Sequence, residues 1–354
     1  MKNKKNLIIL MLVLGILLTA CKKNENTTSM TSEQVKEEVK EEVKESQTKK
    51  TIYVSNYPYY DLTKAIVGDK VDLVNITKNQ GFHNWEPSAK DIADLQEVDL
   101  FIYSGPGLEK WADDLIEKDL IGGSVLALSD GLDLLKSTHS HDHDHEEDHD
   151  HDHEEDHDHD HDHEEDHDHE EDHDHHHDHG EFDPHIWLSL KNAQVMIENI
   201  KDQVTKLDPA NADFYEENYK DLSKKLKDLD NQYEETLKDK KRDEILVSHE
   251  AYGYLCRDYG FKQIGIEGIN PQGEPSIQQI DNIIKLCKEK DIKVIFYEES
   301  ISPKVADLIA NEVGASLELL SPIEVLSKEQ MDAGKGYIEV MADNLKGLDK
   351  ALNE

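Results

Sequence analysis

Apolar and polar positions follow two alternating patterns from Thr51 onward. Short runs rich in β-branched and aromatic residues, typical of strands, are followed by longer stretches with apolar residues at helical spacing. In the first half of the chain the predicted strands are 52–54, 71–76, 100–103 and 125–128, and the predicted helices are 59–67, 88–98 and 108–118. This alternation predicts a mainly parallel sheet with helices on both faces.

A second series of the same kind closes the chain. Its predicted strands are 245–247, 262–266, 294–297 and 317–320, and its predicted helices are 252–259, 277–290, 304–313 and 336–352. Between the two series lies a helical pattern at 189–207 and, after a break at Asp208-Pro209, a longer pattern at 210–240 without Gly or Pro. A helix of about 30 residues spans roughly 45 Å, which is more than one compact domain needs.

These patterns predict an α/β protein with two mainly parallel-sheet lobes joined by a long backbone helix. We expect an N-terminal lobe at 51–207, a linking helix at 208–241 and a C-terminal lobe at 242–354. In open α/β sheets ligands bind beyond the carboxyl ends of the strands. A site in the cleft between the lobes is therefore expected.

The first 50 residues differ from the rest in their pattern. Lys2, Lys4 and Lys5 precede an apolar run at 7–18, and small residues lead to Cys21, as in a lipoprotein export signal at 1–21 that is cleaved before the cysteine. A transmembrane helix needs roughly 20 apolar residues, and this run is shorter. Residues 22–50 are polar and Lys/Glu-rich, and are expected to tether the fold to a lipid on Cys21, with a disordered segment as the alternative. The predicted location is the extracytoplasmic face of the cell membrane.

The charge of the chain narrows the range of partners. The net charge of −40 excludes nucleic acid, because phosphate binding requires a basic face. Residues 139–180 contribute 22 Asp and Glu and no Lys or Arg, so the remainder still carries −18. Such an envelope concentrates cations. For Cys256 and Cys287 the sequence leaves open whether they form a disulfide or stay as buried thiols.

Histidines are distributed very unevenly. Eighteen of the 21 lie between His139 and His179, where imidazoles and carboxylates alternate. This run has no apolar residue to pack into a core, so residues 138–180 are predicted to form an insertion that is disordered without metal. Its many near-equivalent pairings suit weak, rapidly exchanging zinc sites, as in a scavenger or sensor. A solvated loop without function is the alternative.

The other three histidines occupy loop or strand-end positions. His83 lies in NQGFHNWEPS after a predicted strand, His185 in FDPHIWLSL, and His249 directly after EILVS. Taken singly, each is an ordinary surface or core histidine. Together they predict a metal site, because three imidazoles and one carboxylate complete a tetrahedral zinc shell.

Several carboxylates are candidates for the remaining positions around such a metal. Glu298 and Glu299 follow the predicted strand KVIFY, and Glu324 follows LELLSPI; spacing alone does not choose the fourth ligand among them. Asp183 and Glu250 are close enough in sequence to hold the outer nitrogens of His185 and His249. Their alternative role is that of ordinary acids at helix starts.

Four long segments resemble the metal-receptor lipoproteins of zinc-importing ABC transporters, the group typified by ZnuA and AdcA. They are NQGFHNWEPSAKDIADLQEVDLFIYSGPGLEKW, FDPHIWLSLKNA, SHEAYGYLCRDYGFKQIGIEGINPQGEPS and YEESISPKVADLIANEVGASLELLSPIEVL, and the resemblance covers roughly Thr51 to Leu352. It implies a monomeric receptor without enzymatic activity that delivers zinc to a permease driven by a cytoplasmic ATPase. It also implies that His83, His185, His249 and Glu324 hold the zinc ion between the lobes.

Other functions remain as alternatives. Manganese receptors of the same fold resemble this chain less, because they place a carboxylate where His249 stands. A zinc-dependent hydrolase would use the three histidines with Glu250 or Glu298 as general base, although the H-E-x-x-H spacing of common zinc proteases is absent. A surface adhesin or zinc-storage protein is the third alternative.

Overall fold

The computed structural model describes residues 49–78, 80, 81, 83, 85–137, 182–269, 275–299 and 302–354. The predicted export signal, the lipid site at Cys21, the tether at 22–48 and the His-rich insertion lie outside the described residues. No helix in the described part of the chain is both long enough and apolar enough to span a membrane.

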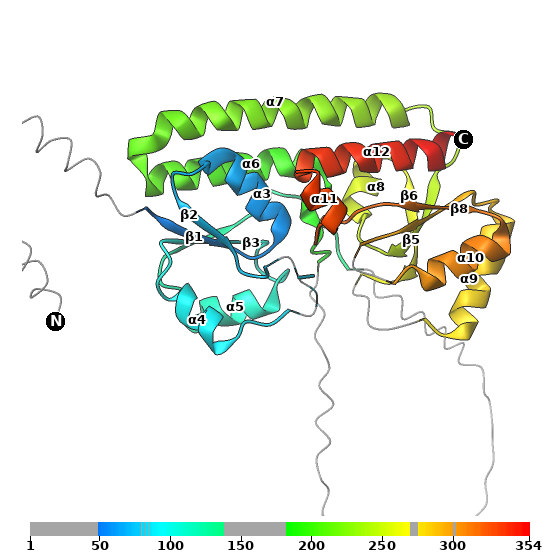
Figure 1. Ribbon diagram of the computed structural model, residues 1–354, viewed down its shortest axis with the longest axis horizontal. Coiled ribbons are helices and arrows are strands. Elements are labelled where there is room, and N and C mark those ends of the chain that lie inside the picture. Colours follow the sequence, from blue (N-terminus) through cyan, green and yellow to red (C-terminus); the bar gives the residue numbers. More distant parts are fainter. Residues whose placement is uncertain are drawn as a thin grey trace, which may run out of the picture. The chain divides into compact units, whose positions relative to one another are not determined.

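Two four-stranded sheets form the framework, and each belongs to one of the two predicted series (Figure 1). The first contains β1 (Thr51–Val54), β2 (Asp72–Asn75), β3 (Leu100–Tyr103) and β4 (Ser124–Ala127) in the order β2-β1-β3-β4. The second contains β5 (Glu244–His249), β6 (Lys262–Glu267), β7 (Val294–Tyr297) and β8 (Ser316–Leu319) in the order β6-β5-β7-β8. The paired strands are parallel in both sheets, which confirms the predicted fold class.

Helices cover both faces of each sheet. In the first lobe they are α3 (Tyr57–Val67), α4 (Ala89–Leu95) and α5 (Lys110–Glu117), and in the second they are α8 (Gly253–Tyr259), α9 (Ile277–Glu289) and α10 (Lys304–Val313). The starts of α4 and α9 are fixed by capping boxes, in which Ser88 pairs with Asp91 and Ser276 with Gln279. Short helices at η1 (Ile186–Leu188), η2 (Pro209–Asn211) and α11 (Lys328–Asp332) complete the loops.

Three long helices run along one side of both sheets: α6 (Leu190–Leu207), α7 (Ala212–Leu237) and α12 (Tyr337–Asn353) (Figure 1). The predicted linking helix is α7, whose 26 residues span about 39 Å. Its buried positions form one stripe at helical spacing: Tyr215, Leu222, Leu226, Leu229, Tyr233 and Leu237. Helix α7 contacts α3 of the first lobe and also α8 and α12.

One hydrophobic core joins the two lobes. It runs from Ile52 and Leu62 in the first lobe through Leu226 of α7 to Val247 and Phe296 in the second. Two smaller cores lie on the opposite faces, under α4 and α5 and under α9 and α10. Cys256 and Cys287 are buried free thiols in two different cores. The large shared core gives the loops at the strand ends a common rigid support.

Candidate metal centre

The three isolated histidines and Glu324 come together at the carboxyl ends of the strands. His83 lies in the loop between β2 and α4, His185 precedes η1, and His249 is the last residue of β5. Glu324 follows β8 by five residues. One potential ligand atom from each side chain lies within 4.8 Å of the other three. Two ligands come from each lobe, as expected for a site between them.

The distances among these atoms match a small tetrahedral ion. Glu324 Oε1 lies 3.1 Å from His83 Nε2, 3.4 Å from His185 Nε2 and 3.5 Å from His249 Nε2. His185 Nε2 lies 3.2 Å from His83 Nε2 and 3.4 Å from His249 Nε2. Zinc bonds to nitrogen and oxygen are about 2.0–2.1 Å long, so the edges of the tetrahedron around the ion are about 3.3–3.4 Å.

Carboxylates behind two of the rings fix the direction of their lone pairs. Asp183 Oδ1 lies 2.8 Å from His185 Nδ1, and Glu298 Oε1 lies 2.7 Å from His249 Nδ1. A carboxylate only accepts, so both Nδ1 atoms carry a proton and, in the neutral rings, both Nε2 atoms present lone pairs to the centre. Lone pairs that converge at these distances repel one another unless a cation lies among them.

The centre is shielded from water and strongly polarised. Burial alone lowers the pKa of His249, but the Glu298 and Glu324 carboxylates outweigh it and raise the pKa to about 10. Burial also lowers the pKa of His185, and Asp183 and Glu324 overcome it and raise the pKa above its ordinary value. Burial raises the pKa of Glu324, yet the imidazoles around it hold that pKa well below its usual range. The surroundings therefore favour positive charge at the centre, carried by protons or by a metal ion.

The alternative carboxylates have other partners. Glu298 stands behind His249, on the far side of the ring from the converging nitrogens, and Glu299 Oε1 accepts from Gln330 Nε2 at 2.7 Å. Glu250 hydrogen-bonds to the backbone of Gly265 and is not the carboxylate on His249 Nδ1. The pairing of His249 with Glu298 was missed because the two residues are 49 positions apart. The only sequence signal for it was that Glu298 directly follows a strand.

The described residues that flank the His-rich insertion meet beside this centre. Lys136 and Phe182 form an antiparallel bridge, and Asp183 N donates to Leu135 O at 2.8 Å. Tyr254 of α8 donates its hydroxyl to Asp183 O at 2.8 Å. The described segments on the two sides of the insertion are thus joined to each other, and Asp183 lies two residues before His185.

Comparisons with known proteins show the family to which the chain is related. The family model described as "Zinc-uptake complex component A periplasmic" (ZnuA) matches residues 52–351. The high-affinity zinc uptake system protein ZnuA of Bacillus subtilis (strain 168) is 40% identical over 308 residues, which are 86% of this chain and 88% of that protein. The zinc-binding protein AdcA of Streptococcus pyogenes is 36% identical over 305 residues, and the matched region spans 56% of its greater length.

A solved structure supports the same relationship. The crystal structure of the Zn(II)-bound ZnuA-like domain of Streptococcus pneumoniae AdcA has a TM-score of 0.68 and 29% sequence identity, covering 87% of this chain and all of that domain. The family match spans nearly the whole described fold, and the first relative aligns over most of both chains. The chain therefore belongs to the ZnuA family of periplasmic zinc-uptake components.

Proposed function

We propose that this protein is an extracellular, membrane-anchored receptor that captures one Zn²⁺ ion tightly and delivers it to an ABC-type importer. The observation that carries the proposal is the convergence of three imidazole Nε2 atoms and one carboxylate oxygen, with five of their separations between 3.1 and 3.5 Å. Three nitrogens and one oxygen suit zinc better than manganese, which favours oxygen-rich sites of higher coordination.

The donor set favours transport over catalysis. A catalytic zinc keeps one position for water, whereas four protein ligands close the shell. The names of the relatives described above refer to zinc uptake and zinc binding. We therefore assign the ion as cargo and propose that His83, His185, His249 and Glu324 are its four ligands.

The segments outside the described fold would hold the protein at the membrane and provide zinc to the site. A lipid on Cys21 and the polar tether would hold the fold on the outer face of the membrane, near a permease that a cytoplasmic ATPase drives. The His-rich insertion would bind several further zinc ions weakly and release them quickly. Because its flanking residues meet next to Asp183, metal released from it would be close to the proposed site.

The main test is metal analysis and competition titration of the protein lacking residues 138–179. We expect one tightly held zinc per chain, lost in His83→Ala, His185→Ala and His249→Ala variants. The matched control is His-to-Ala substitution inside the insertion of the full-length protein, which should leave the tight site intact. If tight zinc binding persists in all three single variants, the proposed site is wrong.

A growth experiment separates the receptor from an adhesin or a zinc store. Deletion of the gene should impair growth in low zinc, and added zinc should restore it. Cells producing the protein without residues 138–179 should take up zinc normally when zinc is plentiful and slowly when it is scarce. Unchanged uptake under starvation would remove the scavenger role of the insertion while leaving the receptor role in place.

A further inference from the structure

Helix α12 carries two buried polar residues on the side that faces both lobes. Tyr337 and Asn344 are 0% and 2% exposed. They are seven residues apart, or about two helical turns, so they lie on the same face of the helix. Each bonds to the backbone of a different segment, and each segment leads within three residues to a proposed zinc ligand.

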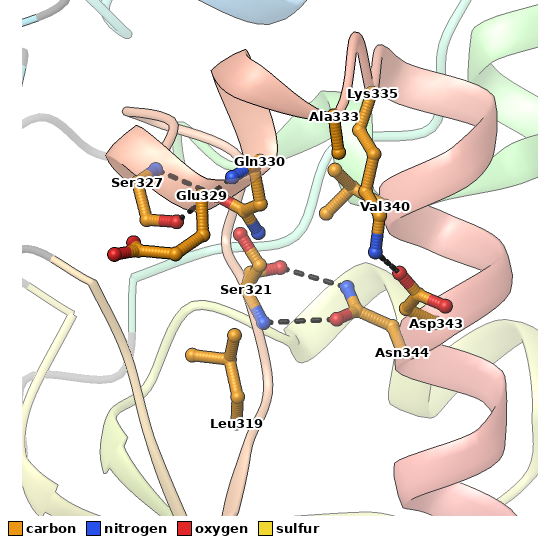
Figure 2. Close-up of a pocket in the computed structure, with 10 residues that line it drawn as sticks. All are labelled: Leu319, Ser321, Ser327, Glu329, Gln330, Ala333, Lys335, Val340, Asp343 and Asn344. Atoms are coloured by element: carbon orange, nitrogen blue, oxygen red, sulfur yellow. Dashed lines mark hydrogen bonds and ion pairs between the residues drawn. The ribbon is translucent and has the colours of Figure 1, made fainter.

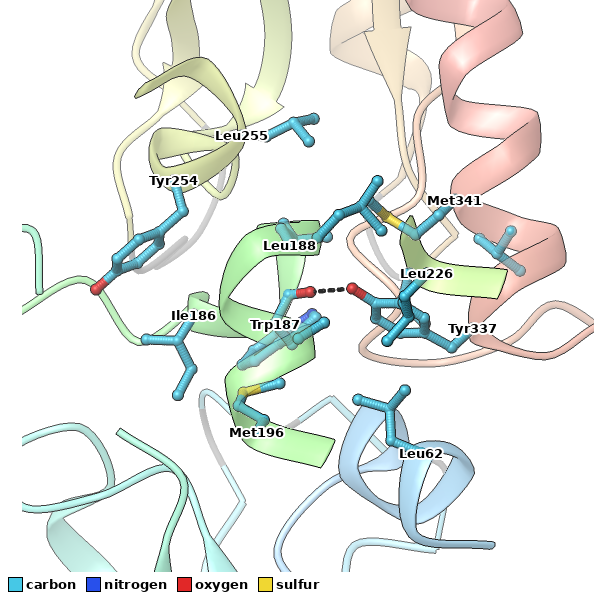
Figure 3. Close-up of a cluster of buried hydrophobic side chains, with 14 of the residues drawn as sticks. Leu62, Ile186, Trp187, Leu188, Met196, Leu226, Tyr254, Leu255, Tyr337 and Met341 are labelled. Atoms are coloured by element: carbon cyan, nitrogen blue, oxygen red, sulfur yellow. Dashed lines mark hydrogen bonds between the residues drawn. The ribbon is translucent and has the colours of Figure 1, made fainter. Parts of the chain in front are cut away.

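Tyr337 holds the segment that carries His185. Its hydroxyl donates to the backbone oxygen of Trp187, two residues after His185 (Figure 3). Trp187 is fully buried, and its ring packs edge-on against the His185 ring, with 5.4 Å between the ring centroids. The Tyr337 hydroxyl therefore restrains the backbone two residues after His185, beside the indole that packs against the His185 ring.

Asn344 holds the segment that carries Glu324. Its Oδ1 accepts from Ser321 N at 2.9 Å and its Nδ2 donates to Ser321 O at 2.8 Å, so one amide pairs with both polar groups of a single backbone residue (Figure 2). Ser321 Oγ in turn accepts from Ile323 N at 3.2 Å. The chain of contacts ends one residue before Glu324.

Ile323 shows that this turn needs such support. Its φ is 62°, in the left-handed region that β-branched residues strongly disfavour. A residue in this conformation persists only where the surrounding structure holds it. The side of the segment that faces α11 and α12 is not tightly packed, because a cavity of about 300 Å³ lined in part by Leu319, Ser321, Val340 and Asn344 lies there. Hydrogen bonds carry much of the restraint on that side.

A third contact connects the two segments directly. Trp187 Nε1 donates to Pro322 O at 2.8 Å, and this bond links the segment that carries His185 to the segment that carries Glu324. The two backbone segments and α12 thus form a closed loop of hydrogen bonds. Within it, His185 Nε2 and Glu324 Oε1 are 3.4 Å apart, close to the edge of a zinc tetrahedron.

We infer that Tyr337 and Asn344 are positioning residues that set the separation between the His185 and Glu324 ligand atoms and so favour a small tetrahedral ion. This inference deepens the proposed function and rests on it. Neither residue contacts the metal position; both act through the backbone of the ligand segments. Loss of the Asn344 restraint allows the Glu324 segment to move toward the cavity, and loss of the Tyr337 restraint releases the His185 segment. In either case the ligand tetrahedron can expand.

The experiment compares Asn344→Leu and Tyr337→Phe with two matched controls. Tyr233→Phe removes a buried hydroxyl on α7 that donates at 2.7 Å to Met341 O of α12. Asn218→Leu removes an amide on α7 that donates at 2.9 Å to Ile66 O. Zinc affinity is measured by chelator competition. Co²⁺ replaces zinc for visible absorption spectroscopy, because tetrahedral Co²⁺ absorbs far more strongly than Co²⁺ of higher coordination.

We expect Asn344→Leu and Tyr337→Phe to weaken zinc binding by about tenfold or more, as outer-sphere substitutions do. The Co²⁺ spectrum of each should lose the tetrahedral intensity, while both controls keep it even if their melting temperatures fall. Wild-type affinity and a wild-type Co²⁺ spectrum in both variants would overturn the inference.

Two further measurements keep the outcomes distinct. If Asn344→Leu does not fold, the substitute is Ser321→Ala, judged by the same two readouts. It removes the hydroxyl that accepts from Ile323 N and that also bonds to Glu299. If the wild-type protein itself binds no zinc, the proposed function and this inference both fail. If the wild type binds zinc and only the positioning variants are unaffected, the inference alone fails.

Discussion

Zinc binding should expel protons from the centre even in alkaline solution. A histidine with the ordinary pKa of about 6.5 is roughly 3% protonated at pH 8 and would release almost nothing. The pKa of His249 is raised to about 10, because Glu298 and Glu324 outweigh the effect of burial, so this ring keeps its proton at pH 8 in the metal-free protein. Zinc can bond to Nε2 only after the proton on that nitrogen has left. Nδ1 then carries the only proton on the ring.

The magnitude follows from the gap between pH and pKa. Two pH units correspond to about 2.7 kcal/mol, so proton competition at His249 weakens apparent zinc affinity by about 100-fold at pH 8. We expect the release of about one proton per zinc at pH 8, from His249. Apparent affinity should rise about tenfold per pH unit for each proton released.

The assay is isothermal titration calorimetry at pH 8 in buffers with different heats of ionisation. The slope of observed enthalpy against ionisation enthalpy gives the number of protons released. Glu298→Gln should lower that number by nearly one, because it removes the main charge that raises the pKa of His249. Glu299→Gln removes a charge from the next residue, whose Oε1 bonds to Gln330, and should leave the count unchanged.

Release of fewer than about 0.2 protons by the wild type at pH 8 would refute the reasoning, because ordinary histidines predict that result. An equal decrease in Glu298→Gln and Glu299→Gln would show a general effect of charge. It would exclude a specific effect of the carboxylate 2.7 Å from His249 Nδ1.

Three further predictions concern the stability of the metal-free protein, the fourth ligand and the start of α12. Folding raises the pKa of His249 to about 10, so the charged ring stabilises the metal-free protein fully below pH 6.5. This stabilisation is lost as pH rises through about 10. The melting temperature of the metal-free form should therefore fall over that interval in differential scanning fluorimetry. Glu324→Gln should weaken zinc binding by more than about tenfold in chelator competition, whereas Glu299→Gln should not. Gly336→Ala should lower the free energy of unfolding by about 1–2 kcal/mol in urea titrations, because its Cβ would lie 2.6 Å from Asp61 Oδ2, which accepts from Tyr337 N at the start of α12.

Each of these has an outcome that contradicts it. A metal-free protein equally stable at pH 6.5 and pH 10 would mean that His249 gains no net favourable interaction when charged. Equal zinc affinities for the Glu324 and Glu299 variants would contradict the assignment of Glu324 as the fourth ligand. Wild-type stability of Gly336→Ala would mean that the Asp61 side chain can rotate away and still accept from Tyr337 N. Asp61→Asn is the companion variant, because the asparagine side chain keeps an oxygen that can accept this bond.

Hydrophobic periodicity predicted the framework well. The strands at Leu100–Tyr103 and Val294–Tyr297 and the helix at Lys304–Val313 have the predicted bounds. The remaining strands and helices differ by a few residues at their ends. Helix α11 was missed because its five residues, Lys328–Asp332, are too few to display a helical period. Its start depends instead on the capping box of Ser327 and Gln330.

The candidate centre was only partly predictable. The rarity of histidine outside the insertion brought out His83, His185 and His249, and strand-end positions brought out the acidic candidates. The neighbours that orient them were harder to find, because Glu298, Tyr337 and Asn344 act across 23 to 150 residues of chain. The sequence does not indicate the positive φ of Ile323, because an isoleucine in this conformation is stabilised by contacts that only the folded chain provides.

The core that runs from Ile52 through α7 to Phe296 has a consequence for how the protein unfolds. Neither half owns a complete apolar interior, so the halves should not be stable when expressed separately. Heating should produce a single cooperative transition instead of two. A ligand held at the junction of both halves would then stabilise the whole molecule. Well above its dissociation constant this stabilisation rises with the logarithm of the free ligand concentration, so thermal unfolding reports how tightly the ligand binds.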